Sequence, residues 1–376
     1  MRTGSRRPFI QAIFLLGCEA VKIKIKSVLL LLFAAAVFSG CAGETEQPVA
    51  TAEPVAVVTA APTPIPTAEP TPEPTPTPGA RIELSGGEEI DWPCGVPFSD
   101  PGFVTVGKTG ADMTEKTEVS GRVICWKCGD YVLEYCFTDD DGEQINHQRT
   151  VHVVPVALPE IVQEEKVIYL SFDDGPCENT REVLEILEKY DAKATFFVIT
   201  SRTKFLDILP EIKDAGHSVG IHANKHSIER LYTSERTFFE DFMTVQEIVH
   251  EYTGEYAQIS RFPGGSRTAN GYLGHKMENG MMDIKNMLAD MGIRYYDWNV
   301  QTEASKSGSS KDTVDRFTTM VPGQTVPVSL QHDTRAYSVR ALEEMLQWGI
   351  ENGYTFKAMD NTVPEVHFEP EEKETD

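Results

Sequence analysis

A regular alternation of short apolar runs with helical patterns begins near Lys166 and continues almost to the end of the 376-residue chain. Strands joined by helices build parallel sheets, because each helix returns the chain to the same edge of the sheet. About seven such repeats predict an α/β domain over residues 160–362, with the architecture of a distorted (β/α) barrel of about seven strands. The predicted strands are 167–172, 194–199, 218–222, 259–262, 293–298, 326–331 and 354–358, and helical patterns between them include 180–190, 235–252 and 339–352.

The preceding segment, residues 81–158, has a different pattern. Runs rich in β-forming residues cover 121–126, 131–137 and 149–154, and clusters of turn residues separate them. Several short strands at this spacing predict a small all-β sandwich. The order of its glycines, tyrosines and final Arg-Thr-Val run resembles the bacterial Ig-like modules of surface proteins. That resemblance implies a spacer or an adhesive module.

The N-terminal region has the pattern of an exported protein. Lysines at positions 22, 24 and 26 precede eleven apolar residues, 28–38, which are followed by Ser39, Gly40 and Cys41. Eleven residues reach about 16 Å as a helix, too short to cross about 30 Å of hydrocarbon, so residues 1–40 are predicted to be a signal region. A cysteine directly after small residues resembles the lipobox of bacterial lipoproteins and predicts a lipid on Cys41. The alternative is an ordinary signal peptide that leaves a secreted protein.

A proline-rich segment separates this region from the folded part of the chain. Residues 48–78 hold ten of the 23 prolines, in repeated Thr-Pro and Glu-Pro steps that favour polyproline II and cannot build a core. We expect residues 41–80 to be the lipid-anchor site and a linker, and residues 363–376 to be an acidic tail. The protein would then stand on the extracellular face of the cell membrane.

The charge balance excludes one class of partner. The chain has 34 Lys and Arg against 58 Asp and Glu, a formal net charge of −24. Such an acidic chain has no basic face broad enough to neutralise a phosphate backbone, so we expect no nucleic-acid partner.

Two pairs of residues at predicted strand ends suit a metal site. Asp173 and Asp174 end the first strand of the barrel pattern. Adjacent carboxylates repel unless a cation or a proton separates their roles, so one suits a metal ligand and the other a base. His222 and His226 follow the third strand, and two imidazoles can converge with one carboxylate on a single metal. A charged turn and a pair of surface histidines are the alternatives.

Later strand ends carry residues suited to acid catalysis and to binding an oxyanion. Arg261 can hold a buried carboxylate, and the backbone N–H of Gly264 can approach a substrate oxygen. Asp297 and His332 end later strands, and an imidazole held by a carboxylate suits a general acid. Taken singly, the motif from Arg261 to Gly264 could also be a tight turn after a strand, and His332 could be an ordinary core histidine.

In this order, the motifs resemble the NodB-homology polysaccharide deacetylases, carbohydrate esterase family four, over residues 166–358. The resemblance implies a divalent metal ion, usually zinc, bound by Asp174, His222 and His226. It also implies that Asp173 is the base that takes a proton from water and that Arg261 orients this base. It implies that His332 is the general acid and that Asp297 pairs with it. Trp298 and Leu330 would line the pocket for the acetyl methyl.

The sequence departs from the family pattern at two motifs. Ala223 follows the first metal histidine, where the family usually has Ser or Thr. Ser227 follows the second metal histidine, where the family often has Pro. Loss of a hydroxyl beside the ligands could weaken metal affinity about tenfold or more. In the third motif, Phe262 stands where the family has a proline. The aromatic residue that the family has before the last glycine is missing here. This second departure puts the shape of the substrate in doubt.

These observations predict an enzyme that hydrolyses N-acetyl groups on an extracellular polysaccharide, either the amino sugars of peptidoglycan or a chitin-like glycan. An O-acetyl esterase acting on xylan-like polymers is the alternative within enzymes. A surface protein that binds glycans without turnover is the alternative outside them, although the complete set of motif residues speaks against it.

Overall fold

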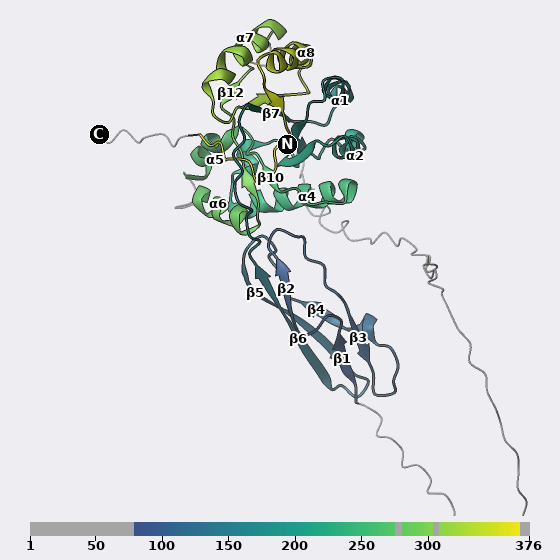
Figure 1. The fold of residues 1–376 in the computed structure, drawn as a ribbon. Coiled ribbons are helices and arrows are strands. Elements are labelled where there is room, and N and C mark those ends of the chain that lie inside the picture. The colour runs from purple at the N-terminus through teal and green to yellow at the C-terminus, as the bar shows by residue number, and fades with distance from the viewer. Residues whose placement is uncertain (1–78, 275–279, 304–307, 369–376) are drawn as a thin grey trace, which may run out of the picture. The chain divides into compact units, whose positions relative to one another are not determined.

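The computed structural model describes residues 79–274, 280–303 and 308–368 (Figure 1). The predicted signal region, Cys41 and nearly all of the linker lie outside these residues, as does the tail from residue 369. Among the described helices, none combines the length and the apolar character that crossing a membrane requires.

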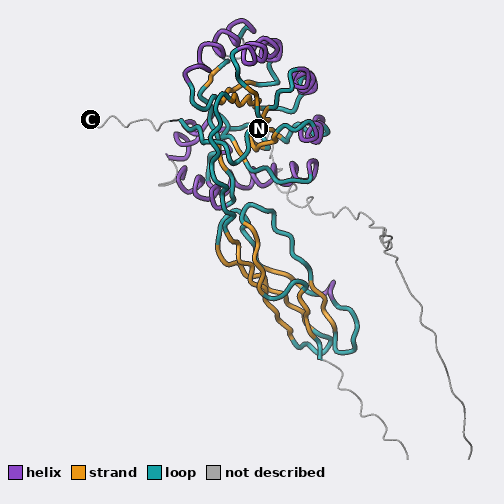
Figure 2. The backbone as a smooth tube through the Cα atoms, viewed as in Figure 1, coloured by secondary structure: helices purple, strands orange, loops and turns teal. Residues whose placement is uncertain are grey.

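Residues 81–154 form the predicted all-β domain, in which strands predominate in Figure 2. One sheet pairs β1 with β3, and a second has the order β2-β6-β5-β4. The long antiparallel pair β5–β6 carries the core, because Leu133, Tyr135 and Phe137 alternate inward from β5 and are buried. The strands are β1 (Arg81–Leu84), β2 (Glu89–Pro93), β3 (Phe103–Val106), β4 (Glu118–Ser120), β5 (Gly129–Thr138) and β6 (Gln144–Val154), with a 3-10 turn η1 (Thr114–Lys116).

One predicted strand of this domain is wrong. Residues 121–126 form a loop, and Lys127 N–H closes a turn onto the carbonyl of Ile124 at 3.1 Å. The carbonyl of Cys125 accepts from Gly95 N–H at 2.7 Å, outside any ladder. The β-forming residues of this segment therefore pack into the core without pairing as a strand.

The second domain is built on a parallel sheet with the order β11-β10-β9-β8-β7-β13-β12, and β14 pairs with β7. The strands are β7 (Val167–Asp173), β8 (Ala194–Ile199), β9 (Ser218–Ala223), β10 (Ile259–Ser260), β11 (Arg294–Tyr295), β12 (Val300–Gln301), β13 (Val328–Gln331) and β14 (Thr355–Phe356). Every residue of β7 is buried, as expected for a parallel strand covered on both faces.

The connection between β11 and β12 shows that the sheet curves. These strands lie at opposite ends of the strand order, yet only residues 296–299 join them. Five residue steps span at most about 18 Å, whereas a flat sheet of seven strands is about 29 Å wide. The two ends must therefore approach each other, which confirms the distorted (β/α) barrel. The predicted strand 293–298 is shortened to β11, and β12, which was not predicted, follows it at the opposite end of the strand order.

Helices follow the strands and cover the outside of the sheet (Figure 1). The longest, α4 (Glu235–Thr253), begins at Ser234, whose hydroxyl accepts from Thr237 N–H. The others are α1 (Thr180–Lys189), α2 (Ile208–Asp214), α3 (Ile228–Leu231), α5 (Gly265–Gly274), α6 (Gly280–Asp290), α7 (Ser310–Met320) and α8 (Ala336–Glu351), with 3-10 turns η2 (Thr203–Phe205) and η3 (Val321–Gly323).

Candidate active site

The site lies where strands of one parallel sheet reach their carboxyl ends. Asp173 is the last residue of β7, His222 lies in β9, Arg261 follows β10, and His332 follows β13. Parallel strands place these ends on one edge, which is where barrels and open α/β sheets bind their ligands. The predicted residues thus come from distant parts of the chain to a single edge.

Asp173 is held by a buried arginine. Arg261 is 1% exposed, and its Nη1 donates to Asp173 Oδ1 at 2.9 Å and to Ser171 Oγ at 2.6 Å. Its Nε and Nη2 donate to the carbonyls of Tyr296 and Asp297. Every arm of this buried guanidinium is bonded, so the arginine presents Asp173 in one orientation.

Ser171 is a site residue that sequence reasoning missed. It lies two positions before Asp173 in β7, so both side chains point to the same face of the sheet. Its hydroxyl donates to the carbonyl of Ser329 at 2.6 Å and accepts from Arg261. The signal that could have found Ser171 is the period of two along β7, because the two adjacent carboxylates stand at the end of that strand.

The three predicted metal ligands meet at one point. One ligand atom each of Asp174, His222 and His226 lies within 4.8 Å of the other two, and these residues form the only such group of three or more in the described part of the chain. Asp174 adopts the left-handed region at φ 70°, which is uncommon for a residue with a side chain, and Arg202 Nη1 donates to its carbonyl at 2.8 Å.

The chemistry of this group fits a divalent metal ion. Oδ1 of Asp174 is buried and has no hydrogen-bond partner, the condition of an oxygen that needs a cation. Nδ1 of His222 donates to the carbonyl of Arg261 at 2.9 Å, so Nε2 is left as a ligand. Burial lowers the pKa of His222, which favours the neutral imidazole that binds a metal. Burial raises the pKa of Asp174, but the neighbouring imidazoles outweigh burial and the net effect lowers it.

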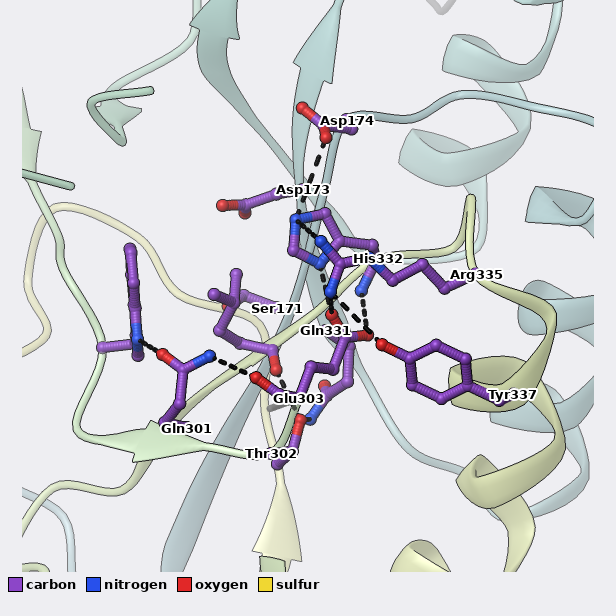
Figure 3. Close-up of polar contacts among 12 residues, drawn as sticks. Ser171, Asp173, Asp174, Gln301, Thr302, Glu303, Gln331, His332, Arg335 and Tyr337 are labelled. Carbon is purple, nitrogen blue, oxygen red and sulfur yellow. Dashed lines mark hydrogen bonds and ion pairs between the residues drawn. The ribbon is translucent and has the colours of Figure 1, made fainter. Parts of the chain in front are cut away.

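His332 lies between Asp174 and a glutamate that the sequence analysis did not single out (Figure 3). Nδ1 of His332 lies 2.6 Å from Glu303 Oε2, and its backbone N–H donates to Oε1 at 3.0 Å. Nε2 faces the metal ligands, 3.8 Å from Asp174 Oδ2. Arg335 Nη1 donates to the same carboxylate. Burial lowers the pKa of His332, but the hydrogen bond to Glu303 and the negative charges of Asp173 and Glu303 together outweigh burial, and the net effect raises the pKa, as a general acid requires.

The predicted pairing of Asp297 with the acid is therefore wrong. The Asp297 carboxylate accepts from Ser266 N–H at 2.7 Å, from the Ser266 hydroxyl, and from Phe368 N–H at 2.9 Å. It follows β11, whereas Glu303 follows β12, the strand that pairs with β13 and so lies beside His332. The sequence analysis predicted one strand over 293–298 and no strand at β12, so it assigned Asp297, near the end of that strand, as the partner of the acid.

We expect Glu303→Gln to lower kcat by about tenfold to a hundredfold. The amide still fills the space, but it does not supply the negative charge that favours protonated His332. Metal content, measured by elemental analysis, is expected to stay unchanged because Glu303 is not a ligand. Glu344→Gln is the matched control, since Glu344 is exposed on α8. Unaltered turnover in Glu303→Gln would show that the glutamate does not assist the acid.

The buried carboxyl of Asp333 connects the loop after Asp174 with the loop that carries His332. Oδ2 of Asp333 accepts from the Thr180 hydroxyl at 2.5 Å, and its carbonyl accepts from Asn179 at 2.8 Å. A Cβ on Gly175 would lie 2.3 Å from Asp333 Oδ2, so only glycine fits there. Burial raises the pKa of Asp333 to about 6. Asp333 therefore keeps the loop after Asp174 in close contact with the loop after β13.

The loop between the two predicted metal ligands His222 and His226 is held by polar contacts, although Ala223 has no hydroxyl. The backbone N–H of Asn224 donates to Asp241 Oδ2 at 2.7 Å, and the Asn224 side chain lies 3.1 Å from the Thr200 hydroxyl. Asp241 comes from α4, so the helix supplies the polar contact that the strand end lacks.

The predicted pocket residues lie beside this centre. The Trp298 ring lies 5.7 Å from the guanidinium carbon of Arg261, and its N–H donates to Gln301. Leu330 is buried in β13, two residues before His332. Gly264 lies in the loop after Arg261. Their roles toward an acetyl group stay predictions.

Comparison with known proteins agrees with this geometry. The family model described as polysaccharide deacetylase matches residues 161–277. A peptidoglycan-N-acetylglucosamine deacetylase of Bacillus cereus is 30% identical over 202 residues, which are 52% of this chain and 70% of that protein. The chain belongs to the polysaccharide deacetylase family.

Further similar proteins are also deacetylases of peptidoglycan. A peptidoglycan-N-acetylmuramic acid deacetylase of Bacillus subtilis is 30% identical over 228 residues, 59% of this chain and 44% of that protein. The crystal structure of the catalytic domain of a peptidoglycan N-acetylglucosamine deacetylase from Eubacterium rectale superposes with a TM-score of 0.53 at 36% identity, covering 57% of this chain and 97% of that one. The N-terminal domain matches the family model of bacterial surface protein Ig-like domains over residues 82–153, which confirms that resemblance.

Proposed function

We propose that this chain is a metal-dependent hydrolase that removes N-acetyl groups from an extracellular polysaccharide. The observation that carries the proposal is the arrangement of Asp174, His222 and His226 beside Asp173, with His332 on the same edge of the sheet. A base, an acid and a metal-binding triad are the groups that amide hydrolysis needs.

The residues divide the work of breaking the amide bond between them. A zinc-type ion, when bound by the triad, lowers the pKa of a water to about 7 and polarises a carbonyl. Asp173, oriented by Arg261, accepts the proton of the attacking water. The backbone N–H of Gly264 stabilises the oxyanion. His332, whose Nδ1 is held by Glu303, donates a proton to the leaving amine as the C–N bond breaks.

We propose the amino sugars of peptidoglycan as the substrate. The relatives from Bacillus cereus and Bacillus subtilis are named for deacetylation of N-acetylglucosamine and N-acetylmuramic acid in peptidoglycan. The predicted lipid on Cys41 and the proline-rich linker support action from the membrane into a cell wall. Zinc is the proposed ion, because two imidazoles and one carboxylate with further positions open are typical of catalytic zinc.

The test is acetate release by the purified protein from peptidoglycan, N-acetylglucosamine oligomers and acetylated xylan, measured side by side. We expect release from the first two, loss of release with a chelator, and recovery on adding zinc. Release from acetylated xylan alone would identify an esterase. No release from any of them with metal bound would favour a glycan-binding protein without turnover.

A further inference from the structure

The end of the described chain packs beside the active site. Phe368 N–H donates to Asp297 Oδ2 at 2.9 Å, and Asp297 N–H donates to the carbonyl of Val366 at 2.8 Å. The His367 ring stacks on Tyr295 with the ring centroids 3.9 Å apart. Asp297 is completely buried, so the segment is attached to a fixed point of the barrel.

This attachment brings the Phe368 ring against Trp298. The two ring centroids are 4.8 Å apart and the rings meet edge to face at 82°. The Trp298 ring in turn lies near Arg261, the residue that holds Asp173. Its N–H is bonded to Gln301, so the indole plane is fixed. Phe368 is therefore separated from the arginine beside the base by a single aromatic ring.

Gly265 makes room for this pair of rings. A Cβ at Gly265 would lie 2.5 Å from Cε2 of Phe368 and 3.2 Å from Cη2 of Trp298. Gly265 follows Gly264, the proposed oxyanion donor. The Phe368 ring thus occupies space next to the motif that, by resemblance, lacks an aromatic residue of its own.

We propose that Phe368 is a specificity-determining residue, which forms with Trp298 an aromatic wall against the sugar ring that carries the acetamide. This inference rests on the proposed function and deepens it. Phe368 is half-buried, and the guanidinium carbon of Arg267 lies 5.5 Å from the centre of its ring. Aromatic side chains supply a large apolar contact area, and sugar rings present C–H faces to it. In this chain the wall comes from the C-terminal segment instead of the third motif.

The experiment compares the full chain with Phe368→Ala and Phe368→Trp on N-acetylglucosamine pentamers. We expect Phe368→Ala to raise KM about fivefold to twentyfold, with kcat within about threefold of wild type and zinc content unchanged. Phe368→Trp is expected to restore most of the affinity, because it keeps an aromatic ring. Tyr252→Ala is the matched control, since Tyr252 is an exposed aromatic residue on α4.

Two kinetic outcomes would overturn the inference. An unchanged KM in Phe368→Ala would show that the ring does not touch the substrate. A fall in kcat with KM unchanged would show that Phe368 only supports Asp297 and the loop it binds.

A binding measurement keeps this test separate from the proposed function. Calorimetric titration of the zinc-loaded proteins with the same pentamer does not require turnover. We expect Phe368→Ala to weaken the affinity by the same fivefold to twentyfold, even if wild type releases no acetate. Equal affinities of wild type and Phe368→Ala would overturn the role of Phe368, whereas a wild type that binds without releasing acetate would overturn only the proposed function.

Discussion

Replacing Asp173 by asparagine is expected to lower kcat for acetate release by about a thousandfold while the metal stays bound. Asparagine has nearly the same shape and still accepts the hydrogen bond from Arg261, but it cannot take a proton from water. General base catalysis contributes about 10²–10⁴ to a rate, which sets the size of the effect. Steady-state acetate release measures kcat, and elemental analysis of the same preparation measures the bound metal.

The neighbouring carboxylate gives the matched comparison for this prediction. Asp174→Asn removes charge from a proposed ligand, so metal content and turnover should fall together. The two variants differ by one position in the chain and separate the base from the ligand. Turnover retained by Asp173→Asn would refute the base, and equal metal loss in both variants would show that the two carboxylates share one role.

Replacing His226 by alanine is expected to remove the metal and all measurable turnover. Only three side chains of the described residues are placed to hold the ion, so the loss of one leaves two ligands. His226 is exposed, unlike His222, so its removal leaves no cavity in the core and the protein should stay folded. We expect bound zinc to fall below about a tenth of an ion per chain after dialysis, as two ligands hold zinc poorly.

His250→Ala is the control for the effect of removing a histidine. His250 is exposed at the end of α4, where its ring stacks on Tyr256 with centroids 4.1 Å apart. Zinc content and kcat should both match wild type in this variant. One full equivalent of zinc in His226→Ala would exclude this histidine as a ligand. Zinc should also raise the melting temperature of wild type but not of His226→Ala, because only a folded site binds it.

Much of the site could be predicted because its chemistry sits at strand ends that the sequence marks locally. The apolar run before Asp173 predicts a buried strand. The pair of carboxylates directly after this run can be seen in the sequence without any tertiary information. The same holds for His222 at the end of its run. Parallel strands bring such ends to one edge, so placing residues at strand ends was sufficient to predict that Asp174, His222 and His226 lie together.

The sequence by itself determined the alternation of strands and helices after residue 166, the Ig-like module before it and the residue types that can bind a metal. Only the tertiary structure decided that Glu303, and not Asp297, holds His332, and that Phe368 reaches Trp298. Hydrophobic periodicity reports burial along one segment, whereas these contacts depend on which strands pair across the barrel. The strands β11 and β12 have only two residues each, too few to show a hydrophobic pattern from which their ends could be predicted. Which carboxylate lies beside His332 therefore depends on the curvature of the sheet.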